Sequence, residues 1–125
     1  MAESIICQRA FAFSVHVLKF CEQLAGRGPA ARHMAWQLAK CGTSIGANAE
    51  EAQEGQTKAD FIAKMSVSRK EAREAAYWLR LAVATGAASA DETAWAIGEC
   101  AHLLTMLRSA IRTAQASPRR HPDPV

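Results

Sequence analysis

The chain has 125 residues, half of them hydrophobic, which suits one domain with a single core. Aromatic residues are sparse and alanine is abundant, so the composition favours helices over strands. A net charge of +3 is too mild to indicate a nucleic-acid binder by itself, and no apolar run approaches the roughly 18–20 residues of a membrane span.

The N-terminal segment predicts a cytoplasmic protein whose first helix covers about residues 5–25. Residues 1–4 lack the basic start of a signal peptide, and Arg9 interrupts the apolar segment behind them. Apolar side chains recur at helical spacing: Ile6, Ala10, Phe13, Val17, Phe20 and Leu24, widened by Phe11, Val15 and Leu18. Gly26 and Gly28 are expected to end this helix because glycine readily adopts left-handed backbone, and Pro29 fits the first turn of the next.

The second predicted helix, from Pro29 to about Gly55, combines an apolar stripe with a polar edge. The stripe is Ala31, Met34, Leu38, Cys41, Ile45 and Ala52. Gly42 and Gly46 leave room for a close neighbour, although glycine costs up to ~1 kcal/mol in a helix interior. A buried polar network with the third helix is expected, because an unmade buried hydrogen bond costs roughly 1–3 kcal/mol. Its predicted members are Ser44, Asn48, Glu51 and Ser68, closed by Arg69 or Arg73.

Two start signals predict the third and fourth helices. Thr57 and Ser89 can each cap a helix, and each is followed three residues later by an acid, as in a capping box. The third helix is therefore expected over residues 57–85 and the fourth over residues 89–117.

Four long amphipathic helices with short joints predict an all-α fold, an antiparallel up-down-up-down four-helix bundle. We assign residues 1–117 to the bundle and residues 118–125, which hold three of the four prolines, to a flexible C-terminal tail. No internal repeat and no linker divides the chain into further domains.

Neither the cysteines nor the carboxylates predict a catalytic or metal site. No cysteines form a Cys-x-x-Cys pair, and all four fit the apolar sides of helices as buried thiols: Cys7, Cys21, Cys41 and Cys100. The chain lacks the Glu-x-x-His pairs on facing helices that di-metal bundles need, a nucleophile signature and a glycine-rich phosphate loop. The sequence therefore predicts a non-enzymatic protein without metal or cofactor.

Apolar side chains also lie on faces that a lone bundle would turn to solvent. Trp78 and Leu81 lie about 100° and about 160° from the centre of the third helix's apolar stripe, and Trp95, His102 and Met106 gather on the outer side of the fourth helix. Outward faces rich in Trp and Met are typical of protein contacts, so these five residues predict an oligomer interface. A homo-oligomer would close as a symmetric dimer or ring. The alternative is a splayed bundle in which these side chains turn inward.

The third helix has a basic edge, which is either a plain solvated face or a face with an anionic partner. A partner would offset the repulsion between like charges one helical turn apart, which is a few tenths of a kcal/mol. One candidate partner is a glutamate of residues 50–54, in the same subunit or the next. The other is a phosphate backbone, with a tyrosine offering a surface for base stacking. The candidate surface is Arg69, Arg73, Tyr77 and Arg80, extended by Arg108 and Arg112.

Three stretches carry a resemblance to a known family. They are CGTSIGANAEEAQ at residues 41–53, TKADFIAK at residues 57–64 and KEAREAAYWLR at residues 70–80. The chain is similar to the bacterial four-helix-bundle proteins first noticed as reading frames in intervening sequences of 23S rRNA genes, and the match extends over all four helices. The specific positions are Ser44, Ile45, Asn48, Glu51, Thr57 and Phe61.

The resemblance implies a small cytosolic bundle without known enzymatic activity that assembles as a homopentameric ring. Related accessory proteins of diversity-generating retroelements use a basic pentamer to bind a reverse transcriptase and nucleic acid. Many members have a glycine and a basic residue where this chain has Ala52 and Gly55, so an anion site at that point is weakened.

Residues and resemblance together predict a non-enzymatic homo-oligomeric scaffold, a pentamer by resemblance, that presents a surface to protein partners. The alternative is an RNA- or DNA-binding ring, accessory to a reverse transcriptase or linked to 23S rRNA intervening sequences. Neither predicted function involves a membrane.

Overall fold

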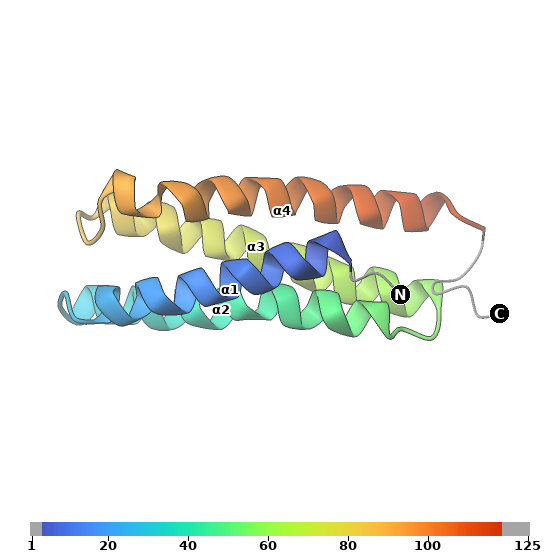
Figure 1. The fold of residues 1–125 in the computed structure, drawn as a ribbon, viewed down its shortest axis with the longest axis horizontal. Coiled ribbons are helices and arrows are strands. Elements are labelled where there is room, and N and C mark those ends of the chain that lie inside the picture. The colour runs from blue at the N-terminus through green and yellow to red at the C-terminus, as the bar shows by residue number, and fades with distance from the viewer. Residues whose placement is uncertain (1–3, 119–125) are drawn as a thin grey trace.

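The structure, a computed structural model, describes residues 4–118, which contain four α-helices and no strand. The helices are α1 (Ile5–Ala25), α2 (Pro29–Gln53), α3 (Lys58–Ala84) and α4 (Ala90–Ala116), and all extend along the long axis of the molecule (Figure 1). The predicted all-α class is confirmed, and each helix ends within two residues of its predicted position. None of the four described helices is both long and apolar enough to cross a bilayer. The predicted tail, residues 118–125, lies outside the described residues except for Pro118.

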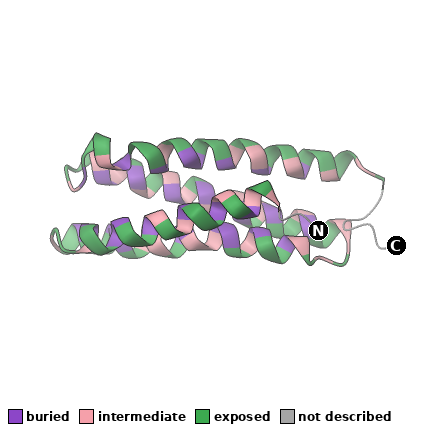
Figure 2. Ribbon diagram, viewed as in Figure 1, coloured by how far each residue is buried: buried purple, intermediate pink, exposed green. Residues whose placement is uncertain are grey.

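The core lies between the inward faces of the helices (Figure 2). α1 packs on α2, α2 on α3 and α3 on α4, while α1 meets α4 over a shorter stretch. Large side chains that are fully buried include Phe13, Leu24, Leu38, Ile45, Met65, Leu79, Leu103 and Leu107. Helical spacing predicts Ile97 and Leu104 on the inward face of α4, but both lie at the edge of the core, and Leu103 is buried.

Two glycines let α1 and α2 approach each other closely, as predicted. A Cβ atom at Gly42 would lie 2.9 Å from Cγ1 of Val17, and one at Gly46 would lie 3.4 Å from Cβ of Ala10. The Ser14 hydroxyl donates across this contact to the carbonyl of Gly42 at 3.3 Å. Packing against α1 therefore explains both glycines inside α2.

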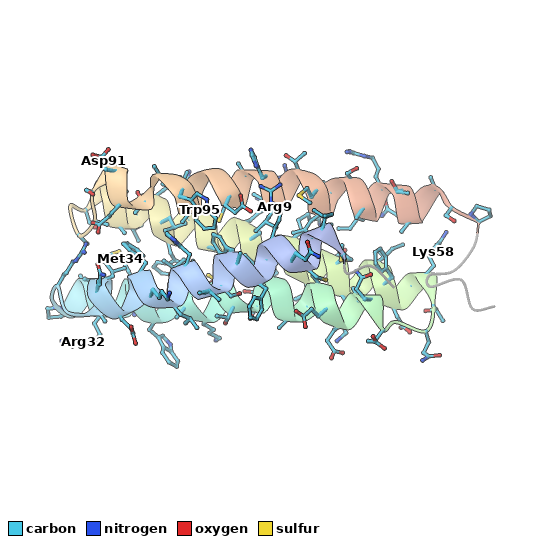
Figure 3. All side chains as sticks on the ribbon, viewed as in Figure 1. Arg9, Arg32, Met34, Lys58, Asp91 and Trp95 are labelled. Carbon is cyan, nitrogen blue, oxygen red and sulfur yellow. The ribbon has the colours of Figure 1, made fainter. Side chains whose placement is uncertain are left out.

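An ion pair that sequence analysis missed holds α1 to α4. The Arg9 guanidinium donates to both carboxylate oxygens of Glu99, at 2.8 and 2.7 Å, and one of its nitrogens lies 2.9 Å from His102 Nδ1. Glu99 is buried, and its hydrogen bonds from Arg9 hold the pKa of the carboxyl below its usual value. Trp95 adds a ring contact between the same helices, with its centroid 4.6 Å from that of His16. Arg9 and Trp95 both lie between α1 and α4 (Figure 3).

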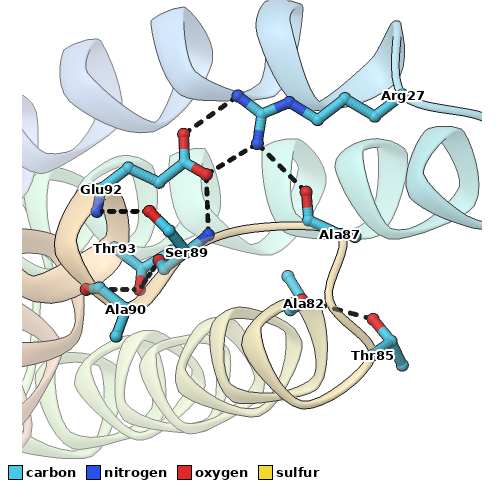
Figure 4. Close-up of polar contacts among 8 residues, drawn as sticks. All are labelled: Arg27, Ala82, Thr85, Ala87, Ser89, Ala90, Glu92 and Thr93. Carbon is cyan, nitrogen blue, oxygen red and sulfur yellow. Dashed lines mark hydrogen bonds and ion pairs between the residues drawn. The ribbon is translucent and has the colours of Figure 1, made fainter.

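Arg27 ties the joint after α1 to the joint after α3 (Figure 4). Its guanidinium donates to the Glu92 carboxylate at 2.7 and 2.9 Å and to the Ala87 carbonyl at 3.0 Å. Glu92 also accepts from the backbone N–H of Ser89 at 2.8 Å, and the Ser89 hydroxyl accepts from the N–H of Glu92, which completes the predicted capping box. Hydrogen bonds from Arg27 and Ser89 lower the pKa of Glu92 to about 2, so this carboxylate stays ionised near neutral pH.

The other helix ends follow the predicted local signals in part, because α3 begins with the predicted cap without the reciprocal bond of a capping box, and Gly26 differs in conformation. The Thr57 hydroxyl accepts from the backbone N–H of Asp60 at 3.0 Å and caps α3. Gly28 and Gly86 take the positive φ values of 122° and 80° that favour glycine. Gly26 was predicted to share this conformation, but its φ is −81°, because the turn places the left-handed residue directly before Pro29.

All four cysteines lie within the described residues and are buried reduced thiols, as predicted. Burial raises the pKa of Cys21 to about 11 and the pKa values of Cys41 and Cys100 to about 12. These thiols therefore stay protonated at neutral pH and pack as small apolar side chains.

Candidate nucleic-acid interface

A groove of about 850 Å³ lies between α3 and α4, at the predicted basic edge. Its basic lining residues are Arg69, Lys70, Arg73, Arg80 and Arg108. Ala76 and Leu104 add apolar surface, and Glu74 is the one acid among the described lining residues. The structure thus brings four of the predicted arginines to one groove, three from α3 and Arg108 from the opposite wall. Arg112, one turn farther along α4, does not line it.

The positive charge of the groove is not neutralised by ion pairs within the described chain. Between residues 4 and 118 the ion pairs are Arg9–Glu99 and Arg27–Glu92, and neither includes a groove residue. The predicted alternative, in which a glutamate of residues 50–54 pairs with the basic edge, is therefore wrong within one chain. The repulsion between neighbouring cations remains, so the groove favours an anionic partner from outside the described chain.

A small aromatic cluster adjoins the cations of the groove. Tyr77 lines the groove with 48% of its surface exposed, and the Trp78 ring meets it at 80° with 5.2 Å between centroids. Trp78 is itself held by a hydrogen bond from its indole N–H to Glu74 at 3.3 Å and by an edge-on contact with His33 of α2. The guanidinium carbon of Arg80 lies 5.9 Å from the Tyr77 centroid, within range of a cation–π contact.

The predicted polar network between α2 and α3 does not take the expected form. The buried Ser68 hydroxyl bridges the two helices directly, donating to the Ile45 carbonyl at 2.7 Å. The Ser44 hydroxyl and the Asn48 side-chain amide instead donate to carbonyls one turn earlier in α2, and Glu51 is exposed. Backbone carbonyls satisfy these groups because they lie within reach of each side chain, so Arg69 and Arg73 are not needed to close a network.

The predicted interface residues separate into two groups. Trp78 and Leu81 are half-buried against the core of their own chain, and Met106 is also half-buried. Trp95 and His102 remain exposed on α4. The predicted splayed alternative therefore describes Trp78 and Leu81 better, because α3 packs against both α2 and α4 and buries a wider face than a single stripe.

Large apolar side chains are exposed on α1 and α2, at positions where the sequence pattern did not predict exposure. Phe11, Val15 and Leu18 repeat at i, i+4 and i+7 on α1 and are exposed, Phe11 by 62%. They were predicted to widen the core, whereas α1 buries the opposite stripe that includes Phe13. Trp36 of α2 is 67% exposed and was not singled out.

The chain resembles one protein family throughout most of its length. A sequence model described as 23S rRNA-intervening sequence protein matches residues 2–109, which include every residue that lines the groove. Among solved structures, a protein of unknown function from the S23 ribosomal protein family of Bacteroides thetaiotaomicron is 29% identical and superposes with a TM-score of 0.81. That match covers 86% of this chain and 99% of the other. No curated protein matches the chain.

Proposed function

The chain belongs to the 23S rRNA-intervening sequence protein family, and from this membership we propose that it is a non-enzymatic cytoplasmic protein that binds nucleic acid through the groove between α3 and α4. One observation carries the proposal: five basic side chains line the groove, and none of them is engaged in an ion pair within residues 4–118. Guanidinium groups suit this role because they present several donors in a planar fork that matches phosphate oxygens.

Binding that rests on these cations must weaken steeply as salt rises, because each neutralised phosphate releases condensed counterions. For about five phosphate contacts to a single strand, the affinity is expected to fall roughly 100-fold between about 50 and 200 mM salt. Fluorescence anisotropy of labelled RNA and DNA oligonucleotides measures this directly. Absence of binding at the lower salt concentration, or an affinity that salt leaves unchanged, would contradict the proposal.

A second candidate function, a homo-oligomeric scaffold for protein partners, is favoured by the exposed apolar residues of α1. A solvated helix face rarely repeats large apolar side chains at i, i+4 and i+7, as Phe11, Val15 and Leu18 do. We propose that sister copies cover this face, together with Trp36 and Trp95, in a closed ring. The number five rests on the family resemblance.

Charge placed within this α1 stripe tests the assembly. The wild type is expected to sediment at micromolar concentration as an oligomer of the 13.5 kDa chain, and Leu18→Glu is expected to sediment as a monomer, because an unpaired carboxylate is costly in an apolar contact. Lys19→Glu is the matched control, since it adds an acid at the adjacent exposed position. A monomeric wild type would refute the ring. Loss of the oligomer in both variants would rule out the α1 stripe as the specific interface.

We also propose that the helices run antiparallel, up-down-up-down. The joints after α1 and α3 lie at one end of the molecule and the joint after α2 lies at the other (Figure 1). Arg27 supports this order, since it lies in the joint after α1 and its guanidinium contacts Ala87 in the joint after α3 and Glu92 in the first turn of α4. Joints this short favour antiparallel neighbours in helical bundles.

A further inference from the structure

Tyr77 occupies the point where two hollows of the surface meet. It lines the basic groove and also a second hollow of about 290 Å³, formed with Arg80, Leu81 and Ala84. Half of its surface is exposed although it lies among cations and apolar side chains. The two hollows share Tyr77 and Arg80, and their lining residues on α3 extend from Ser66 to Ala84.

The orientation of Tyr77 is set before any ligand arrives. Trp78 meets its ring at 80°, and Trp78 is anchored by Glu74 on one side and by His33 on the other. Arg80 places its guanidinium over the Tyr77 ring. An exposed aromatic ring that neighbouring side chains contact and cations flank is the combination with which proteins stack the bases of single-stranded nucleic acid.

We propose that the groove takes a single strand of nucleic acid, with one base stacked on Tyr77 and the flanking phosphates held by the arginines; this inference rests on the proposed function. A duplex hides the faces of its bases inside the helical stack, so Tyr77 would contribute nothing to duplex binding. An unpaired base offers its face to the ring, and stacking tolerates any sequence because every base has such a face.

The placement of the cations fits the same ligand. Arg73 lies about one helical turn before Tyr77 and Arg69 about two turns before it, so at roughly 1.5 Å per residue the cations from Arg69 to Arg80 span about 16 Å of α3. Arg108 faces them from α4. Cations on two walls can surround one backbone that enters the groove, whereas a duplex is too wide to enter between adjacent helices and would meet the rim alone.

Two variants of Tyr77 test the inference on the full chain. The probes are labelled single strands of RNA and of DNA of about 15 nucleotides, each beside the matching blunt duplex, at one low salt concentration. Tyr77→Leu is expected to weaken single-strand binding roughly 10-fold and to leave duplex binding unchanged. Tyr77→Phe keeps the ring and is expected to bind like the wild type. Equal melting temperatures of the three proteins show that the fold is intact.

The outcomes separate this inference from the proposed function. If the wild type binds single strand and duplex equally, with steep salt dependence, the groove is a nucleic-acid site but the single-strand assignment fails. If Tyr77→Leu leaves single-strand affinity unchanged, or weakens single strand and duplex alike, base stacking on Tyr77 is refuted. If the wild type binds neither form at low salt, the proposed function fails as well.

Discussion

Reversing two charges in the groove, Arg69→Glu together with Arg73→Glu, is expected to weaken nucleic-acid binding roughly 100-fold or more near physiological salt. Each substitution removes one phosphate contact and adds a carboxylate that repels the backbone. Loss of two contacts also lowers the slope of log affinity against log salt by roughly 1.4–1.8. Anisotropy titrations of the same oligonucleotide at several salt concentrations provide both quantities.

A double variant on α2 is the matched control for the charge reversal. Arg32 and Lys40 are exposed and do not line the groove, so Arg32→Glu with Lys40→Glu changes the net charge by the same amount. The control is expected to keep most of the wild-type affinity. If both double variants lose affinity equally, binding follows net charge and the groove has no special role. Stability is expected to change little in either case, because surface charges contribute little to folding.

The helix ends were predictable because the signals that set them are local. Thr57 and Ser89 each cap a helix by accepting from the N–H three residues later. The turn glycine at position 28 can likewise be recognised without knowing the tertiary fold. The basic edge of α3 was predictable for the same reason, since residues spaced by whole turns share a helix face. Lys70 was missed because it lies beside Arg69 and not one turn away, and its place in the groove depends on where α4 packs.

Contacts between segments far apart in the sequence could not be predicted from the helical spacing of residues within each segment. Arg9 and Glu99 pair across 90 residues, and nothing in either helix alone indicates that both charges turn toward the same seam. The helical pattern placed Phe13 in the central apolar stripe of α1 and Phe11 beside it, but the pattern alone does not tell how wide a face the core covers. Packing against α2 decides this width, and it leaves Phe11 outside.

The contact between α1 and α2 predicts opposite effects for the same substitution at two glycines one turn apart. Replacing glycine by alanine in a helix interior stabilises by up to ~1 kcal/mol through propensity alone. At Gly46 the added Cβ meets Ala10 at 3.4 Å, an ordinary contact, so Gly46→Ala is expected to be neutral or stabilising. At Gly42 the added Cβ lies 2.9 Å from Cγ1 of Val17, and overpacking costs roughly 1–3 kcal/mol. That cost exceeds the gain in propensity, so Gly42→Ala is expected to destabilise.

The larger side chain of Gly42→Leu should force the two helices apart and is expected to cost more than about 3 kcal/mol. Val17 cannot swing aside easily, because a β-branched side chain in a helix has one strongly preferred rotamer. Urea unfolding followed by circular dichroism measures all three variants against the wild type. The double variant Gly42→Ala with Val17→Ala supplies the control: removing the methyl groups that the new Cβ meets should make the alanine at position 42 less harmful than it is beside valine. If Gly42→Ala is as stable as Gly46→Ala, the close approach of α1 at Gly42 is refuted.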